Sequence, residues 1–192
     1  MSSFRFSCLV LLGVVQVSFA QHHPPIEIQK IDIQFQNAPI YATTGSTQQI
    51  SSADRWVVME VEIDTRPEWV DEATFEVFVL LKGRDGYYSL QGKSTYQHIE
   101  KGRGHLISMY ISPQSFKRFV GVGNAQAIED VIIRVTYENT VPDTFSKATG
   151  RRFAARRWWE SLPPQPSVLR PFNETPWFPA FVGKYEQLKP PQ

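Results

Sequence analysis

Residues 55–82 read RWVVMEVEIDTRPEWVDEATFEVFVLLK, and this stretch decides the fold. It contains two apolar runs joined by a polar corner around Pro67. Apolar side chains recur at every second position of each run, which is the pattern of a strand buried on one face. Val, Ile and Phe also favour strands. The pair therefore predicts two central strands of an antiparallel β-sandwich, with an inner face formed by Val57, Met59, Val61, Ile63, Phe75, Val77, Val79 and Leu81.

Further strand patterns lie on both sides of this pair. Asp85-Gly86 is typical of a tight hairpin turn, and Gly92 indicates a bulge or bend within a strand. Ser112-Pro113 predicts the start of a short helix that ends at Gly121. About seven strands with short connections predict a mainly β, immunoglobulin-like antiparallel β-sandwich with a short inserted helix. The additional strands are expected at 26–36, 87–99, 106–111 and 128–138. Residues 37–52 are expected to form a long loop with a weak strand near Ile40.

The first 20 residues have the pattern of a secretory signal peptide. Arg5 precedes an apolar run over 8–17, and Ser18-Phe19-Ala20 places small residues where signal peptidase cleaves. The alternative is an uncleaved membrane anchor, but the apolar run is shorter than the roughly 20 residues that span a bilayer. We therefore expect cleavage before Gln21, no remaining transmembrane helix, and a location in the periplasm, the outer envelope or at the cell surface.

Charge and cysteine content exclude several classes of function. Loss of Arg5 with the signal peptide reduces the 20 basic residues to 19, against 19 acidic residues. A neutral exported domain has no long-range field to attract nucleic acid, so no nucleic-acid partner is expected. The only cysteine, Cys8, is lost as well. The mature chain would then have no disulfide and no thiol nucleophile, which is more typical of a bacterial envelope protein than of an animal extracellular domain.

The sequence changes character after the sandwich, which is expected to occupy residues 21–140. Residues 141–162 predict an amphipathic helix with an apolar stripe and an arginine-rich opposite side. Two interpretations remain open. The helix binds an anionic membrane surface or an acidic partner, or its tryptophans pack on the sandwich while its arginines stay in solvent. The stripe consists of Ala155, Trp158, Trp159 and Leu162, and the opposite side of Arg152, Arg156 and Glu160.

Residues 163–192, here called the tail, are rich in proline and aromatic residues. Eight of the 30 residues are proline, which prevents a regular helix or a central strand. Disordered linkers are poor in aromatic residues, so we expect the tail to be extended and to dock. It can cover an exposed sheet edge of its own domain, or it can bind a partner. Its candidate anchors are Trp177, Phe178, Phe181 and Tyr185.

No group of residues predicts catalysis or a cofactor. His98 and His105 flank a Lys-Gly-Arg-Gly turn, but a zinc site needs three or four ligands and no third is marked. Glu60 and Glu62 share one face of a strand, where both are expected to be solvated, although acid/base catalysis needs a buried carboxyl group. Nucleophile-elbow, P-loop and zinc-protease motifs are missing from the sequence. We therefore expect no catalytic residue, no metal site, no cofactor and no enzymatic activity.

Two segments carry a family resemblance: WVVMEVEIDTRPEWVDEATFEVFVLL at 56–81 and HIEKGRGHLISMYISP at 98–113. They resemble a family of secreted pilus-like proteins that are encoded with a bacterial type IV pilus-like gene cluster. The resemblance covers about Ile26 to Glu138. It implies an immunoglobulin-type sandwich, similar to archaeal flagellar stator components, with an envelope or pilus-associated role and no catalysis. A prepilin-type N-terminus is missing, so an accessory role is expected instead of a polymerising one.

The expected function is that of an exported, non-enzymatic envelope protein, an accessory component of a type IV pilus-like assembly. Its partners would be envelope or pilus-like assembly proteins, with peripheral membrane contact as a further option. A secreted carbohydrate-binding module is the alternative, with Tyr87, Tyr88 and Tyr96, or Trp177 and Phe178, as sugar platforms. Coplanar exposed rings would favour that alternative, and buried rings would not. The candidate partner-binding residues are Arg152, Arg156, Trp158, Trp159, Trp177, Phe178, Phe181 and Tyr185.

Overall fold

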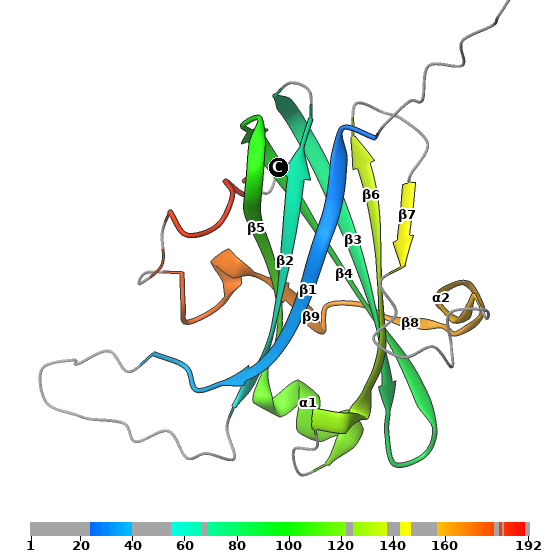
Figure 1. Ribbon diagram of the computed structural model, residues 1–192. Coiled ribbons are helices and arrows are strands. Elements are labelled where there is room, and N and C mark those ends of the chain that lie inside the picture. The colour runs from blue at the N-terminus through cyan, green and yellow to red at the C-terminus, as the bar shows by residue number, and fades with distance from the viewer. Residues whose placement is uncertain are drawn as a thin grey trace, which may run out of the picture.

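A computed structural model of the chain describes residues 24–39, 55–66, 69–121, 125–137, 143–146, 157–178, 181 and 183–190. Its two β-sheets pack face to face (Figure 1), which confirms the predicted β-sandwich. The expected signal peptide lies outside the described residues. The first sheet has the order β1 (Ile26–Gln36), β2 (Trp56–Thr65), β5 (Gly102–Ile111) and β9 (Leu169–Pro171), and the second has β7 (Asp143–Ser146), β6 (Ile128–Tyr137), β3 (Val70–Lys82), β4 (Tyr87–Ile99) and β8 (Pro164–Gln165).

The strand order is that of an immunoglobulin-like sandwich. Without the short β8 and β9, the order is β1-β2-β5 in one sheet and β7-β6-β3-β4 in the other. The chain therefore changes sheet after β2, after β4 and after β5, and the fourth strand pairs with β3. These pairs are all antiparallel, and only β8 joins its neighbour in parallel. The resulting arrangement puts the long β2 and β3 at the centres of the two sheets.

The core between the sheets is built from the alternating positions of β2 and β3. Every residue assigned to the inner face from the sequence is buried there, as predicted. The outer faces of these strands are covered as well. Val58 is buried on the outside of β2, and Phe78 and Leu80 are buried on the outside of β3. Strands that are apolar on both sides need a cover on each face, so other segments must lie over both sheets.

Helix α1 (Pro113–Val120) forms where the sequence predicts it and lies at one end of the sandwich (Figure 1). The Ser112 side chain accepts a hydrogen bond from the backbone N–H of Ser115, which caps the first turn. Phe116 and Phe119 are buried, and the Phe116 ring packs edge to face on Phe35 of β1 at 5.4 Å between centroids. The short helix η2 (Ala125–Ala127) follows and leads into β6.

Tyr96 joins the two sheets through a hydrogen bond inside the core. This β4 residue is fully buried, and its ring packs edge to face on Phe75 at 5.7 Å between centroids. Its hydroxyl donates to the carbonyl oxygen of Ser108 on β5 (3.4 Å) and accepts from the N–H of the same residue (3.3 Å). The phenol therefore bonds to both backbone polar groups of Ser108, and buried backbone groups need such partners.

Tyr96 also predicts how stability changes at alkaline pH. Burial raises the pKa of Tyr96 to about 12 from its ordinary value of 10.0. Between these values the unfolded chain loses the proton and the folded chain keeps it, so the free energy of unfolding falls by about 2 kcal/mol as pH rises through this window. Burial also raises the pKa values of Tyr110 and Tyr185, which act in the same direction. Urea denaturation across this window should show a shallower loss for Tyr96→Phe, and an equally steep loss would contradict the assignment.

The predicted helix over 141–162 was wrong at its beginning. Residues 143–146 form β7, which pairs with β6 from Ile132 to Val135. The free edge of β6 offers a ladder of hydrogen bonds, and such tertiary pairing overrides local helical preference. The only helical turn described in the predicted range is α2 (Trp158–Ser161). Arg152, Arg156 and the weak strand expected near Ile40 lie outside the described residues.

Candidate functional site

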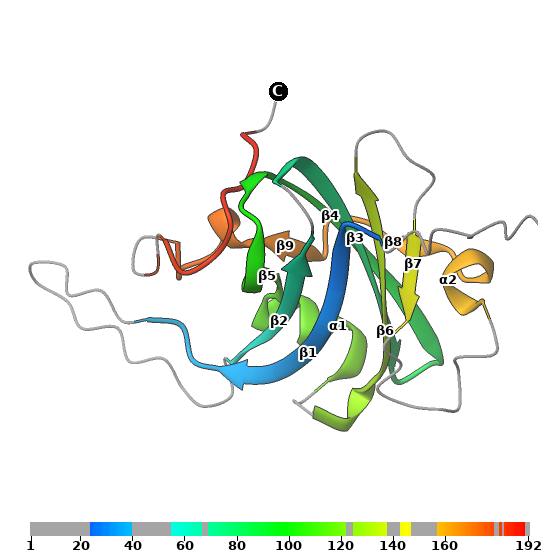
Figure 2. The same ribbon diagram turned by 45° about the horizontal axis from the view of Figure 1, so that its top comes forward.

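The tail lies along the side of the sandwich where β4 and β5 form the sheet edges (Figure 2). Strand β8 pairs in parallel with β4 at Ser89 and Leu90, and β9 pairs with β5 from Met109 to Ile111. Further along the tail, Leu188 forms an isolated bridge with Tyr96 of β4. Of the two interpretations left open for the tail, the structure supports docking on its own domain. Both edge strands gain partners that protect them from other chains.

The last described segment of the tail is bonded to both sheets. The N–H of Glu186 donates to the carbonyl oxygen of Leu106 on β5 at 3.0 Å. The N–H of Lys189 donates to the carbonyl oxygen of Thr95 on β4 at 2.8 Å. Within four residues the backbone therefore spans from one sheet to the other. This segment acts as a brace between the two sheets on their otherwise open side.

Gly92 is the position of β4 that lets the tail approach. A Cβ atom on Gly92 would lie 2.4 Å from the Cβ of Leu169, which is impossible without movement of the backbone. The sequence predicted a bulge or bend at Gly92; strand β4 pairs with β3 without a register shift, so the bulge is not formed. The glycine serves instead as the contact point at which β9 packs against β4. Glycine in a strand commonly marks such a close approach of another backbone.

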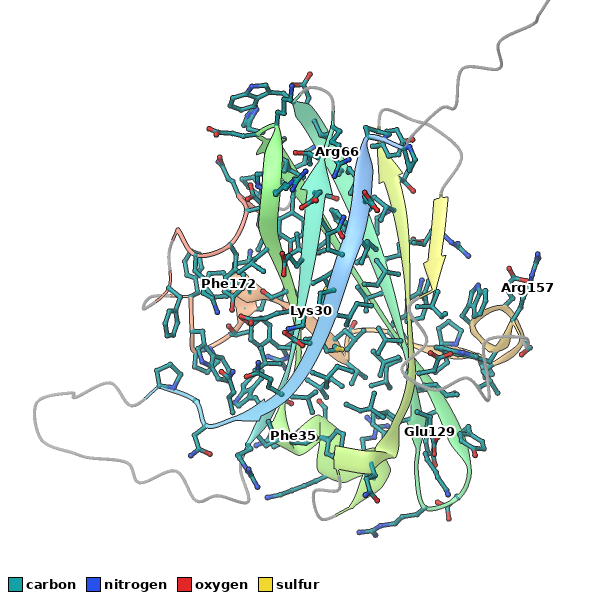
Figure 3. The ribbon with its side chains drawn as sticks, in the orientation of Figure 1. Lys30, Phe35, Arg66, Glu129, Arg157 and Phe172 are labelled. Atoms are coloured by element: carbon teal, nitrogen blue, oxygen red, sulfur yellow. The ribbon has the colours of Figure 1, made fainter. Side chains whose placement is uncertain are left out.

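Aromatic rings of the tail cover the outer face of the first sheet. Trp177 is buried and stacks on Tyr110 of β5, with 5.3 Å between ring centroids and 28° between planes. Trp56 of β2 meets the same indole edge to face at 5.5 Å. Phe172, at the start of the short helix η3 (Phe172–Glu174), packs beside Tyr185 at 4.6 Å (Figure 3). The tail therefore buries Val58 and Tyr110, which would otherwise face solvent.

Glu60 is the polar centre of this covered face. The hydroxyl of Tyr185 and the ammonium of Lys184 both donate to its Oε1 atom, each at 2.5 Å. Its side chain is only 18% exposed, so the expectation of a freely solvated carboxylate was wrong for Glu60. Burial and the bond to Glu60 raise the pKa of Tyr185 well above its usual range, so this phenol stays protonated as a donor. The hydrogen bonds of Lys184 and Tyr185 to Glu60 hold the tail on the first sheet.

Two further side-chain pairs bind the tail to the sandwich. Nδ1 of His105 lies 2.8 Å from Oε1 of Glu186. The ammonium of Lys189 lies 2.6 Å from the Glu72 carboxylate, and this hydrogen bond lowers the pKa of Glu72. His98 is exposed and takes a positive φ of 56° beside the turn. Among the described residues, no three His, Cys, Asp or Glu side chains gather where they could hold a metal ion.

Trp158 lies on the outer face of the second sheet. It is buried against Phe78, Leu80 and Ile132, and its Nε1 donates to Oδ2 of Asp130 at 2.9 Å. The Asp130 carboxylate is fully buried, and its Oδ1 also accepts from a backbone N–H. For Trp158 the structure supports the interpretation in which the tryptophan packs on the sandwich. No described helix is both long and apolar enough to span a membrane.

The candidate partner-binding residues therefore separate into buried and exposed groups. Trp158 and Trp177 are part of the folded interior, so their side chains do not offer a surface to a partner. Trp159 and Tyr185 are half-buried. Phe178 is 44% exposed and Phe181 is 42% exposed, although both lie on the docked tail. Among the members of the candidate set that the structure describes, these two rings are the exposed ones.

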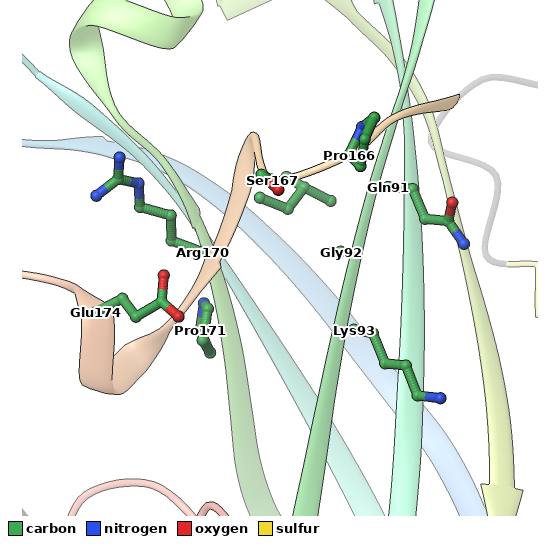
Figure 4. A pocket seen from close by; sticks show the side chains of 9 residues that line it. Gln91, Gly92, Lys93, Pro166, Ser167, Arg170, Pro171 and Glu174 are labelled. Atoms are coloured by element: carbon green, nitrogen blue, oxygen red, sulfur yellow. The ribbon is translucent and has the colours of Figure 1, made fainter. Parts of the chain in front are cut away.

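Two hollows adjoin the exposed part of the tail. One, of about 450 Å³, is lined by Phe172, Phe178 and Tyr185 together with polar groups such as Asn173. The other, of about 530 Å³, lies between β4 and β9 (Figure 4). Its rim carries charges of both signs, from Lys93 on β4 and from Arg170 and Glu174 on the tail. Neither hollow could be predicted from the sequence, because the first forms between distant parts of the tail and the second between the tail and β4.

The aromatic residues suggested as sugar platforms do not form a flat exposed array. Tyr96 and Trp177 are buried, and Tyr88 is half-buried against Phe119. Tyr87 is 43% exposed. Phe178 lies at 68° to its neighbour Phe172. By the criterion of coplanar exposed rings, these residues do not favour a sugar-binding platform.

Comparisons with known proteins agree with this fold. A protein-family model matches residues 17–192 of the chain. Among solved structures, a crystal structure of a protein from Akkermansia muciniphila is similar, with a TM-score of 0.72 and 20% sequence identity. The similarity covers 87% of this chain and 93% of that chain, and at this identity it establishes the shared fold. No curated protein matches the sequence.

Proposed function

The chain belongs to a family of pilus-like proteins, and from this we propose that it is an exported accessory component of a type IV pilus-like assembly. It acts at the cell envelope through contacts with other proteins of that assembly. It catalyses no reaction. The resemblance of residues 56–81 and 98–113 to secreted pilus-like proteins supports the finer assignment of location and role.

The observation that carries this proposal is the exposed aromatic surface of the tail. Phe178 and Phe181 stay exposed on a segment that is fixed to the sandwich by Trp177, by Glu60 and by hydrogen bonds to both sheets. Large aromatic side chains held rigidly at a surface lose little conformational entropy when a partner covers them, and they are enriched where proteins meet. The surface is therefore suited to a protein partner.

The proposal of a non-enzymatic role is supported by the state of two carboxylates, the candidate Glu60 and the buried Asp130. Glu60 has its Oε1 occupied by Lys184 and Tyr185, and Asp130 is bonded to Trp158. General acid/base catalysis needs a carboxyl group within reach of a substrate proton. Both of these groups are instead used to hold covering segments on the sandwich.

Affinity capture from envelope extracts of the producing cells tests the proposal. The native chain should recover pilus-like or secretion components, which mass spectrometry identifies. The double variant Phe178→Ala and Phe181→Ala should reduce that recovery about tenfold or more, because exposed aromatics at interfaces often act as hot spots. Tyr87→Ala, which removes a similarly exposed ring at the β3–β4 turn, is the control and should leave recovery unchanged.

Three results would contradict the proposal. The native chain could recover no component of such an assembly. The tail variant could recover the components as well as the native chain does, which would exclude this surface. Saturable binding to a glycan array would favour the carbohydrate-binding alternative.

A further inference from the structure

Strand β1 is the long sheet edge that the tail does not cover. The tail supplies partners to β4 and β5, whereas β1 is paired only with β2 among the described residues. It is 11 residues long, while β7, the edge strand of the other sheet on the same side, has four. A long edge strand has a row of backbone groups ready to pair with another strand. Within the part of the chain that the structure describes, the tail thus protects one side of the sandwich, and no strand pairs with the outer edge of β1 on the other side.

The second part of β1 is regular and has two distinct faces. A register shift between Ile28 and Lys30 marks a bulge, after which residues 30–36 pair with β2 without interruption. On the inner face, Ile31, Ile33 and Phe35 are only half-buried, although they pack on the core. Further burial of these apolar side chains would be favourable. Residues 30–36 therefore combine an outer backbone edge that no described strand pairs with and apolar side chains that the described residues cover only in part.

We propose that residues 30–36 of β1 pair antiparallel with the same residues of a second copy of this chain. The two-fold axis passes between Ile33 and its counterpart in the second copy, at the middle of the regular segment. The two four-stranded sheets then become one continuous sheet with β1 and its counterpart at the centre. The pairing is isologous, as in most dimers of identical chains. It rests on β1 alone and is independent of a role in a pilus-like assembly.

The register at Ile33 follows from the side chains that it places opposite each other. On the inner face, Ile33 meets Ile33 of the second copy, and Ile31 meets Phe35. Pairs of apolar and aromatic side chains of this kind stabilise antiparallel sheets. On the outer face, Asp32 lies opposite Gln34 of the second copy, and Lys30 opposite Gln36, so no like charges meet.

Neighbouring registers are less favourable. An axis at Asp32 would set that carboxylate directly against its own copy, and like charges in opposite positions destabilise a sheet. An axis at Ile31 would bring the bulge into the new ladder. An axis at Gln34 would leave Lys30 and Ile31 without strand partners. Each register keeps apolar residues on one face, as a continuous sheet requires, but only the axis at Ile33 uses the whole regular segment.

Lys30 is the feature of β1 that argues most strongly against pairing, because lysine on an edge strand discourages association. In this structure Lys30 lies on the polar side of β1 (Figure 3), where its ammonium is 2.5 Å from a carboxylate oxygen of Asp32. Asp32 is on the same face two residues along the strand. The charge on the edge is therefore locally balanced, and the proposed register leaves this ion pair intact.

Disulfide trapping tests the register directly. In the full chain carrying Cys8→Ser, which removes the only native cysteine, Ile33→Cys places two thiols opposite each other. Opposite residues in an antiparallel pair have Cα atoms about 4.5–5.5 Å apart, within the range of a disulfide. Ile31→Cys is the matched control, because its two copies would lie four residues, about 13 Å, apart. Under mild oxidation, Ile33→Cys should form covalent dimer at least about tenfold faster, since paired thiols have a high effective concentration.

A charge change at Gln36 tests the pairing without cysteine. Gln36→Glu would face Lys30 of the second copy and should lower the dimer dissociation constant about threefold or more, and Gln36→Lys should raise it by a similar factor, because each dimer contains two such pairs. Sedimentation equilibrium measures both values. Urea denaturation at low concentration, where only monomer is present, should show similar stability for the two variants.

Three outcomes would overturn the proposal. The chain could remain monomeric at all concentrations in sedimentation equilibrium. The two cysteine variants could form covalent dimer at equal rates, or the control faster. The two Gln36 variants could shift the dissociation constant in the same direction, which would show that a different surface pairs.

Discussion

Trp177→Ala should lower the free energy of unfolding by about 3–5 kcal/mol, the range observed when a buried tryptophan or phenylalanine is truncated. The indole is 5% exposed and contacts rings from two strands, Tyr110 on β5 and Trp56 on β2. Its removal leaves a cavity under the tail and re-exposes the outer face of the first sheet. The midpoint of urea denaturation, followed by intrinsic fluorescence, measures the change.

Phe181→Ala is the matched control for this prediction. The ring also lies on the tail, four residues after Trp177, but it is 42% exposed. Truncation of a surface side chain usually changes stability by no more than about 0.5 kcal/mol. If Trp177→Ala and Phe181→Ala unfold at the same urea concentration, the tail does not stabilise the sandwich in solution.

Trp158→Ala should have an effect of similar size, about 3–5 kcal/mol. It removes the apolar cover of Phe78 and Leu80 and also leaves the buried Asp130 without its indole donor. Trp158→Phe separates these contributions, because it keeps most of the apolar contact and removes only the N–H group. Loss of that single donor to a buried acceptor should cost about 1–3 kcal/mol. Urea denaturation of the two variants gives both values.

A double-mutant cycle distinguishes the hydrogen bond from packing. Asp130→Asn keeps the shape of the side chain and removes its charge. If the bond from Trp158 to Asp130 is formed, Trp158→Phe and Asp130→Asn should be non-additive by about 0.5–3 kcal/mol. Additive effects would mean that Trp158 stabilises the fold through apolar packing alone, and would contradict the hydrogen bond between Trp158 and Asp130.

The two central strands could be predicted from the sequence because a period of two leaves little choice. A shift by one residue would move Met59 or Val77 from the core to the outside and bring Glu60 or Glu76 inward. Short-range signals were equally reliable for helix α1, where Ser112 and the following proline start the helix. In both cases residues close in sequence determine the structure, and no distant segment competes with them.

Positions covered by the tail could not be predicted in this way. Glu60 and Glu62 look equivalent in the sequence, yet the tail reaches only Glu60, where Tyr185 and Lys184 bind. The partners lie more than 120 residues apart, and the tail has no periodicity that would indicate which face it covers. For the same reason the sequence could not separate the buried Trp177 from the exposed Phe178.

One signal in the sequence did point to covering segments. Val58, Phe78 and Leu80 occupy outer-face positions of strands whose inner faces were already assigned. Apolar residues on both faces of a strand require a cover on each side, or they leave an exposed apolar patch. Read together with the aromatic tail, these positions indicate that the tail and Trp158 complete the fold.

The brace formed by residues 186–189 has a consequence for the order of events after synthesis. A ribosome makes every strand that these residues hold before it makes the brace itself. Until then the edges of β4 and β5 are uncovered in the growing polypeptide, and exposed strand edges promote aggregation. The sandwich is therefore complete only after residues 186–189 have emerged. A chain that terminates before them would be prone to aggregation and would not form a smaller folded domain.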